Sequence, residues 1–406
     1  MADTVVQLKC ECKHDPWGKQ GSSSLAGRLW SQIPGSDELS ESDTYSEMWM
    51  GTYPTAPSRL VSNDELLSSY LKKNHDLVGN SFFKRYNTEV PFLPKVLSFQ
   101  KALPLQIHPD KKLAEKLHNK DPIKFGDTNH KPEIAIALSR FELFVGFKPR
   151  ERLAEVYGLK PLEKIVPQDK RSLDEEVLRE TCRTLLSLPP EEVADLIKEL
   201  QKVPNSELGN HQNIPALLDR LSEQYSEFDN GNLVATLLMN YMVLEPGQAI
   251  CVPADSIHAY LSGDILECMA RSDNVLNTGF CPRADRDNVD LFAQALTFKP
   301  QGTDAALLPG HPSLLGSNGR TTKYAPPISE FNVLYLDLQP SQNETHAELQ
   351  SPSIFVVTQG SGKMKILGEG RSVDLQEGSV YFAGRSAKLQ FYSDDGLKLY
   401  RSYATI

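Results

Sequence analysis

The sequence predicts a mainly β protein with one helical insertion, and two contrasting patterns support this fold class. The first ~100 residues and the part after about residue 228 contain short apolar runs between Gly, Ser and Pro. Between residues 149 and 227, apolar residues instead recur at three- and four-residue spacing, as they do on one face of a helix. We therefore expect a helical block of roughly 75 residues, over 150–227, between β segments.

Strands are predicted on both sides of this block. Before it, residues 95–108 (KVLSFQKALPLQIH) contain two strand-like runs that are separated by the polar Gln100 and Lys101. After it, residues 244–260 (LEPGQAICVPADSIHAY) predict a short strand between two turns, and then a strand that approaches His258.

The helical block contains four segments with helical spacing: RERLAEVYGL, SLDEEVLRETCRTLLSL, PPEEVADLIKELQKV and IPALLDRLSEQYSEF. Pro189 and Pro190 stand where the start of a helix tolerates proline. Glu191 and Glu192 follow, near the positive end of the helix dipole. These residues predict a helix that starts at the proline pair.

The C-terminal part returns to β character. Residues 353–367 (SIFVVTQGSGKMKIL) alternate apolar and polar residues around Gly360 and Gly362, which predicts a hairpin there. Further short strands follow at even spacing with Gly turns, a pattern typical of a sandwich or jelly roll. No set of metal ligands is evident in this part, so we expect it to serve packing or assembly.

Composition excludes several classes of protein. The chain has 406 residues, enough for two or three domains, with 40% hydrophobic and 24% charged residues. Its formal charge of −10 argues against a nucleic-acid-binding protein that relies on a basic face. Neither a signal peptide nor an apolar run near ~20 residues is present, so we expect a cytoplasmic protein without a membrane span.

The six cysteines are scattered, which favours reduced thiols over a disulfide framework. Cys10 and Cys12 have the spacing of a metal-binding pair, but no second pair of Cys or His lies at a useful distance.

Three short segments carry residues with metal-binding chemistry. Gln106 and His108 are two apart, so in a strand they share a face. Glu133 and Lys131 follow some 25 residues later, and His258 ends the hairpin at 244–260. Gln, His, Glu and His form a nitrogen and oxygen ligand set that suits Zn²⁺ with one open position. A single strand histidine is more often a hydrogen-bonded core residue, and spacing alone does not show that the segments converge.

These segments resemble the signatures of the type I phosphomannose isomerases, the zinc-dependent mannose-6-phosphate isomerases of cupin type, and the likeness is to eukaryotic and fungal members. The matching residues run in order to about residue 300: Trp17-Gly18-Lys19, Glu47-Met48-Trp49-Met50-Gly51, Gln106-Ile107-His108-Pro109-Asp110-Lys111, Asn129-His130-Lys131-Pro132-Glu133, His258-Ala259-Tyr260-Leu261-Ser262-Gly263-Asp264 and Glu267-Cys268-Met269. The resemblance implies two cupin-type jelly-roll barrels plus a helical domain. It places the catalytic domain at 1–149 and 228–300, the helical domain at 150–227 and the second β domain at 301–406.

The resemblance also implies a site and a reaction. One Zn²⁺ per chain would be held by Gln106, His108, Glu133 and His258. The reaction would interconvert mannose 6-phosphate and fructose 6-phosphate through a cis-enediol and supply GDP-mannose synthesis. The implied partner is a small sugar phosphate, and we expect a monomer, with a dimer left open.

Such a reaction needs a positioned base, an electrophile for the developing negative charge, and cations or N–H groups for the phosphate. The catalytic candidates are Lys131, Glu267 and Arg283. The candidates for substrate binding are Trp17, Glu47, Lys95, Tyr260 and Asp273.

The chain departs from the family pattern at residues of the expected site. Asn277 stands where the family has an active-site Arg, and Arg283 stands where it has a Lys; Pro104 and Asp15-Pro16 are further departures. Asn forms hydrogen bonds but supplies no fixed positive charge. We favour restoration of this charge by Arg283, Arg286 or Arg271.

Other interpretations remain open. The chain could be a slower isomerase, or one with a different sugar specificity. It could also be a non-catalytic sugar-binding relative that keeps the metal. An iron-dependent cupin oxygenase is a further alternative, although the Gln and Glu ligands do not suit its triad of two His and one carboxylate.

Overall fold

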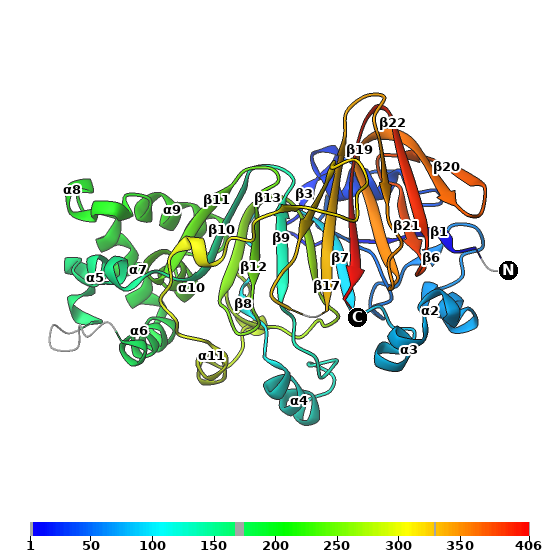
Figure 1. The fold of residues 1–406 in the computed structure, drawn as a ribbon. Coiled ribbons are helices and arrows are strands. Elements are labelled where there is room, and N and C mark those ends of the chain that lie inside the picture. Colours follow the sequence, from blue (N-terminus) through cyan, green and yellow to red (C-terminus); the bar gives the residue numbers. More distant parts are fainter. Residues whose placement is uncertain (1–2, 167–173, 329, 406) are drawn as a thin grey trace.

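The computed structural model describes residues 3–166, 174–328 and 330–405. It contains two ten-stranded sheets and a group of helices at one end of the molecule (Figure 1). The mainly β class with a helical insertion is therefore confirmed. The described strand pairings leave each sheet with open ends, so neither forms a continuous closed barrel.

The central sheet lies between the helices and the other sheet (Figure 1), and has the order β11-β10-β13-β7-β5-β2 with four further strands attached. Its strands are β2 (Glu11–Lys13), β5 (Glu47–Trp49), β7 (Phe92–Phe99), β8 (Leu105–Ile107), β9 (Glu133–Ala137), β10 (Phe141–Phe147), β11 (Met239–Leu244), β12 (Ala249–Val252), β13 (His258–Ala270) and β14 (Leu276–Gly279). The two strands predicted before residue 110 are β7 and β8. β13 pairs with β7, β8, β9 and β10, and so connects the segments that carry the predicted site.

The second sheet has the order β15-β16-β17-β22-β19-β21-β1-β6, with β18 beside β22 and β20 beside β19. Its strands are β1 (Val5–Lys9), β6 (Arg59–Leu60), β15 (His311–Pro312), β16 (Thr321–Tyr324), β17 (Phe331–Leu338), β18 (Asn343–His346), β19 (Ser353–Leu367), β20 (Arg371–Gln376), β21 (Val380–Ala383) and β22 (Lys388–Ala404). The N-terminal strand β1 thus pairs with β21, far along the chain, with Val5 opposite Ala383. A separate two-stranded ribbon is formed by β3 (Lys19–Gln20) and β4 (Thr44–Tyr45).

The hairpin predicted around Gly360 and Gly362 is wrong, because β19 continues through both residues. A Cβ on Gly360 would lie 2.0 Å from the carbonyl oxygen of Gly396, and one on Gly362 would lie 1.9 Å from that of Tyr392. These glycines therefore allow β22 to approach β19 closely, at a point where the register shifts. The chain reverses later, between β19 and β20.

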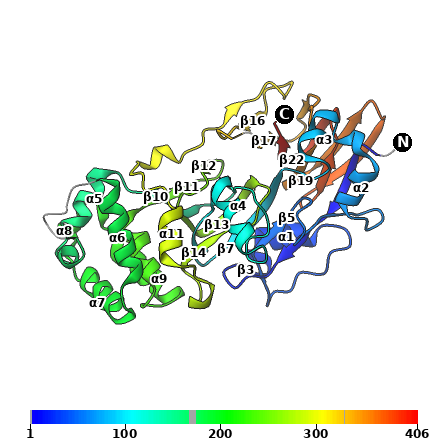
Figure 2. The ribbon, with the colours of Figure 1, turned by 90° about the horizontal axis from the view of Figure 1, so that it is seen from below.

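The helical block confirms the predicted helices and lies at one end of the central sheet in both views (Figures 1 and 2). It comprises α5 (Arg150–Tyr157), α6 (Glu175–Ser187), α7 (Pro190–Gln201), α8 (Asn205–Leu208) and α9 (Ile214–Gln224). The helix α7 begins at Pro190, as predicted, with Glu191 and Glu192 in its first turn. Ser172 and Leu173, at the start of the second predicted segment, lie outside the described residues.

The remaining helices flank the sheets. They are α1 (Leu25–Ser31), α2 (Leu67–Lys73), α3 (Asn80–Tyr86), α4 (Lys111–Lys120), α10 (Asn230–Leu233) and α11 (Val289–Ala295), with a π-helical turn at Val234–Leu238. Short 3₁₀ helices lie at Gly21–Ser23, His75–Leu77, Lys160–Lys164, Gly209–His211, Arg283–Asp285 and Thr303–Ala305. None of the helices in the described ranges is long and apolar enough to cross a bilayer.

Two large apolar cores hold these parts together. One joins the helical block to the central sheet and includes Ile107, Phe144 and Leu185. The other joins the central sheet to the second sheet and includes Val96 and Phe382. The predicted site therefore lies on a strand scaffold that is packed from both sides. The exact domain boundaries, 1–149 with 228–300, 150–227 and 301–406, stay a prediction.

Candidate functional site

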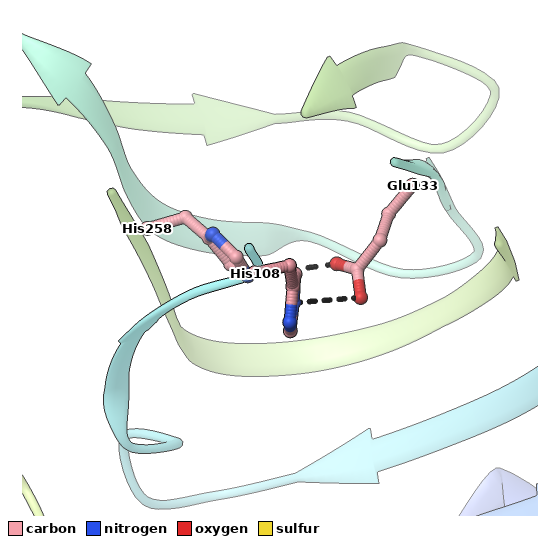
Figure 3. A group of neighbouring side chains, drawn as sticks. All are labelled: His108, Glu133 and His258. Carbon is pink, nitrogen blue, oxygen red and sulfur yellow. Dashed lines mark ion pairs between the residues drawn. The ribbon is translucent and has the colours of Figure 1, made fainter. Parts of the chain in front are cut away.

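Three of the four predicted metal ligands converge in the central sheet. Nε2 of His108 lies 3.1 Å from Oε1 of Glu133, and Nε2 of His258 lies 3.5 Å from Oε2 of the same carboxylate. Figure 3 shows the three side chains pointing toward one another from separate segments. His108 follows β8, whereas Glu133 and His258 begin β9 and β13. The pairing of β13 with β8 brings the two histidines together, because His258 lies opposite Gln106. Glu133 lies opposite Val252 and Met269 and approaches the histidines from another part of the sheet.

The hydrogen bonds of the two histidines leave one nitrogen of each ring available. Nδ1 of His108 lies 2.8 Å from the carbonyl oxygen of Asn274, and Nδ1 of His258 lies 3.0 Å from that of Ser256. A carbonyl only accepts, so each Nδ1 carries the proton and each Nε2 keeps its lone pair. Both Nε2 atoms are buried and have no hydrogen-bond partner among the described residues.

The distances in this cluster fit a metal ion. The ligand atoms of His108, Glu133 and His258 all lie within 4.8 Å of one another. Around a tetrahedral zinc ion with bonds of about 2.0–2.1 Å, neighbouring ligand atoms lie about 3.3 Å apart, close to the observed separations. Two buried nitrogens without partners would be costly unless an ion or another group completed the site.

The charge states in the cluster also suit metal binding. Burial, opposed by the carboxylate of Glu133, lowers the pKa of His258 to about 4. Burial and the charge of Lys131 likewise lower the pKa of His108. Burial acts to raise the pKa of Glu133, but the nearby His108 outweighs it and the net direction is down. Neutral imidazoles and an ionised carboxylate are the forms that bind metals.

The fourth predicted ligand, Gln106, occupies the matching position on β8. Its Cα is paired with that of His258 in the neighbouring strand. Residues directly opposite each other share a face, and so do residues two apart in a strand, which places Gln106 on the face of both His108 and His258. Its role as a ligand stays a prediction.

Tyr260 and Lys131 contact Glu133 directly. The Tyr260 hydroxyl donates to Oε2 of Glu133 over 3.3 Å, and Nζ of Lys131 lies 3.6 Å from Oε1. Lys131 is buried, and its ammonium also lies 3.8 Å from Oδ1 of Asp273. The structure thus brings three more of the predicted site residues around the cluster.

A second buried cluster lies on the neighbouring strands β5, β7 and β13. Nζ of Lys95 lies 3.2 Å from Glu47 and 3.5 Å from Glu267, and these side chains are at most 12% exposed. Lys95 also lies over the Trp49 ring, 4.1 Å from its centre, while Lys13 lies over the same ring at 3.7 Å. The lysine is therefore fixed by two carboxylates and an aromatic surface.

Glu267 differs from the other carboxylates in its pKa. Burial, with the negative charge of Glu133, raises the pKa of Glu267 to about 8, although Lys95 and Lys131 act in the opposite direction. Burial acts to lower the pKa of Lys95, but Glu47 and Glu267 raise it overall. A buried carboxyl that exchanges its proton near neutral pH, beside a permanent cation, is suited to acid–base chemistry.

Two predicted residues lie apart from these clusters. Trp17 packs against the core group that includes Tyr260. Arg283 is exposed in the 3₁₀ helix Arg283–Asp285 and lines a cavity of about 660 Å³ with Tyr225 and Asp229. Within the described part of the chain, Arg283 forms no hydrogen bond or ion pair with His108, Glu133 or His258.

The other two arginines considered as replacements for the missing charge are paired elsewhere. Arg286 lies 2.8 Å from Asp229, and Arg271 lies 2.8 Å from Glu89. Asn277 itself is paired with Gln106 across β14 and β8, so it lies in the same row as His258.

Asn274 is a supporting residue that the sequence did not reveal. Its carbonyl orients His108, and its side-chain amide donates to the carbonyls of Asp127 and Asn129, at 2.7 and 3.2 Å. It therefore ties the loop before Lys131 to the metal cluster. A backbone carbonyl is present at every position, so no sequence signal marks this function.

Comparison with known proteins gives consistent results. The family model for the catalytic domain of type I phosphomannose isomerase matches residues 5–150. The mannose-6-phosphate isomerase of Aspergillus fumigatus is 33% identical, covering 95% of this chain and 92% of that protein. The one from Cryptococcus neoformans is 34% identical over 99% of both chains.

Solved structures show the same fold. A mannose 6-phosphate isomerase bound with zinc and yttrium has a TM-score of 0.83 at 24% identity, covering 100% of both chains. The apo form from Salmonella typhimurium has the same TM-score and identity, also over 100% of both chains.

Proposed function

Because this chain belongs to the type I phosphomannose isomerase family, we propose that it interconverts mannose 6-phosphate and fructose 6-phosphate through a cis-enediol. The observation that carries the proposal is the buried cluster of His108, Glu133 and His258, in which both Nε2 atoms lack a hydrogen-bond partner among the described residues. Lys131 contacts Glu133, and burial together with the charge of Glu133 raises the pKa of Glu267 to about 8. A metal site next to a group that exchanges protons near neutral pH is what this isomerisation needs.

We infer that the cluster holds one Zn²⁺ per chain. His108, Glu133 and His258 would bind it, with Gln106 as the fourth ligand. When bound, the ion supplies an electrophile for the negative charge that develops on the sugar oxygens. A related solved structure is described as bound with zinc. The hydrogen bonds at Nδ1 hold both imidazoles in the tautomer that such binding requires.

The proton transfer is assigned to Glu267. Isomerisation moves a proton from the carbon next to a carbonyl to the neighbouring carbon, so one group must accept it and return it. A carboxyl with a pKa of about 8 populates both protonation states near neutral pH. Lys131, held between Glu133 and Asp273, presents positive charge to the oxygens of the enediol.

The remaining predicted residues shape the pocket. Lys95 offers a fixed charge to the substrate, and Glu47 holds its ammonium in place. Tyr260 orients Glu133, and Trp17 packs against the core group that includes Tyr260. Arg283 is assigned a weaker contribution to binding, since its exposed guanidinium is screened by water and salt.

Asn277 favours a second candidate function, an isomerase with altered sugar specificity or a sugar-binding relative without turnover. It occupies the row of Gln106 and His258, where the family has a charged side chain. In the first candidate function, the enzyme supplies mannose 6-phosphate for GDP-mannose synthesis in the cytoplasm and acts as a monomer.

The test is a coupled assay with mannose 6-phosphate on the purified chain, before and after chelation and after zinc is restored. We expect activity to disappear with the metal and to return with zinc. Glu133→Gln keeps the side-chain shape but removes a negative charge, so it should lose bound zinc as well as activity. Glu89→Gln, a partly exposed carboxylate paired with Arg271, is the matched control and should retain zinc. Absence of turnover at every metal loading would reject the isomerase and favour the sugar-binding relative.

A further inference from the structure

Lys124 contacts the carboxylate of Asp287, which is hydrogen-bonded to the backbone of Asn277. The ammonium of Lys124 pairs with Oδ1 of Asp287. The other oxygen of this carboxylate accepts from the backbone N–H of Asn277 over 2.9 Å, and the N–H of Asp287 donates to the Asn277 carbonyl over 2.8 Å. Asp287 is therefore fixed to the edge of β14, and it holds Lys124 there. The side chain of Asp287 is 4% exposed, whereas that of Lys124 is 47% exposed.

The strand register connects this pair to the metal cluster. His258, Gln106 and Asn277 are direct neighbours across β13, β8 and β14. Residues opposite each other share a face, and adjacent strands lie about 4.8 Å apart, so Asn277 is roughly 10 Å from His258 on the same side of the sheet. Asp287 takes the next position beyond Asn277 through its two hydrogen bonds with the Asn277 backbone, and Lys124 contacts its carboxylate. Figures 1 and 2 agree with this arrangement, because α4, which precedes Lys124, and α11, which follows Asp287, lie at the same end of the central sheet.

The polar groups at this position indicate what it can bind. Oδ1 of Asn277 is buried and has no hydrogen-bond partner among the described residues, so its capacity to accept a hydrogen bond is unused. An ammonium group has three N–H donors, and Asp287 uses one of them. Two donors of Lys124 remain for the oxygens of an anion, and the exposure of the side chain allows an anion to reach them.

We propose that Lys124, positioned by Asp287, binds the phosphate of the substrate and supplies the positive charge that Asn277 lacks. This inference rests on the proposed function, since the sugar end of the substrate must lie at the metal cluster for its phosphate to reach β14. The phosphate is then held by a partly exposed ammonium, which makes substrate affinity sensitive to ionic strength. Lys124 binds substrate without touching the reacting carbons, so it affects KM and leaves kcat nearly unchanged.

The test compares Lys124→Gln with the wild-type enzyme. Glutamine removes the charge but still donates to Asp287, which prevents the loss of folding that an unpaired buried carboxylate would cause. We expect KM for mannose 6-phosphate to rise about tenfold and kcat to change by less than about twofold. Inhibition by inorganic phosphate should weaken by a similar factor, and the salt dependence of KM should become shallower. Lys124→Arg should retain most of the affinity, and Asn277→Arg should restore it in the Lys124→Gln background.

Lys120→Gln is the matched control, because Lys120 is exposed in the last turn of α4 and should leave every parameter unchanged. An unchanged KM and phosphate inhibition in Lys124→Gln, with turnover intact, would overturn the inference and leave the isomerase function standing. If the wild type shows no turnover, binding is measured by calorimetry with a hexitol 6-phosphate and, as a reference, with the unphosphorylated hexitol. This measurement separates phosphate binding by Lys124 from the isomerase function. Binding that depends on both the phosphate and Lys124 would then support the inference while the isomerase proposal fails. Absence of binding to the wild type would overturn both.

Discussion

Lys95→Met is the perturbation that most directly tests the electrostatic organisation of the site. The side chain of Lys95 is 4% exposed, and its ammonium lies 3.2 Å from Glu47 and 3.5 Å from Glu267. Methionine preserves much of the length and the contact with the Trp49 ring, but it removes the charge from between two carboxylates. At an effective dielectric constant of 20, the pair with Glu47 contributes about 5 kcal/mol of Coulomb energy, which is an upper bound because burial opposes it. The pair with Glu267 contributes less, because a carboxyl with a pKa of about 8 is mostly protonated at pH 7.

The expected loss of stability is smaller than this sum. Removing one partner of a buried ion pair typically costs about 3–5 kcal/mol. The carboxyl of Glu267 already has a pKa of about 8, so it takes up a proton and relieves part of the cost. We therefore expect Lys95→Met to lower the free energy of unfolding of the metal-free protein by about 3 kcal/mol at pH 7.

The loss should depend on pH in a defined direction. Without Lys95, the carboxyl of Glu267 keeps a folded-state pKa well above its unfolded value of about 4.3. A group of this kind favours the folded state when it is protonated, so the variant loses stability as the pH rises from 5 to 8. The assay is urea unfolding of the chelated protein at pH 6 and pH 8, followed by circular dichroism.

Lys13→Met provides the matched control. Lys13 contacts the same Trp49 ring from a more exposed position, so its loss should cost less than about 1 kcal/mol. Equal stability of the Lys95 and Lys13 variants, or a Lys95 variant that is more stable at pH 8 than at pH 6, would refute the reasoning.

Three further substitutions test other parts of the structure. Asn274→Ala removes the amide that holds the loop before Lys131. We expect the zinc affinity, measured by competition with a chelator, to fall about 10–100-fold. An unchanged zinc affinity would argue against this supporting role. Gly362→Ala places a Cβ 1.9 Å from the carbonyl oxygen of Tyr392, so the melting temperature should fall markedly. A melting temperature equal to that of the wild type would show that β19 and β22 can move apart at little cost in free energy. Arg283→Ala should raise KM for mannose 6-phosphate by less than Lys124→Gln does; a larger effect would make Arg283 the main phosphate ligand.

The metal ligands were predictable from the sequence mainly through the resemblance of their segments to a known family, and only in part through strand periodicity. Gln106 and His108 share a face through their two-residue spacing, and the turn before His258 starts the strand that pairs with theirs. The approach of Glu133 to the two histidines is not given by local register, because Glu133 lies opposite Met269, at the other end of β13 from His258, so it depends on the shape of the whole sheet. Residues that act through long-range placement were not predictable in this way. Lys124 is more than 150 positions from its partner Asp287, and nothing near Asn277 in the sequence indicates it.

The hairpin expected at Gly360 and Gly362 failed for a related reason. Glycine occurs both in turns and where two backbones approach each other closely, and local sequence does not distinguish these uses. The deciding fact is the position of β22, which lies against β19 and leaves no room for a side chain at either residue. The alternation of apolar residues around them is what a long continuous strand also shows.

The pairing of β1 with β21 has a consequence for how the protein is made. The strand β1 leaves the ribosome long before β21, because Val6 lies opposite Phe382, and its earlier partner β6 pairs only with Leu8 and Lys9 on the other edge. Until β21 is synthesised, one edge of β1 therefore stays unpaired, and such edges are prone to association with other chains. Folding through so distant a contact is also slow, since a large loop must close first. Deleting the first nine residues should leave β21 as a bare edge, and the truncated protein should aggregate during expression.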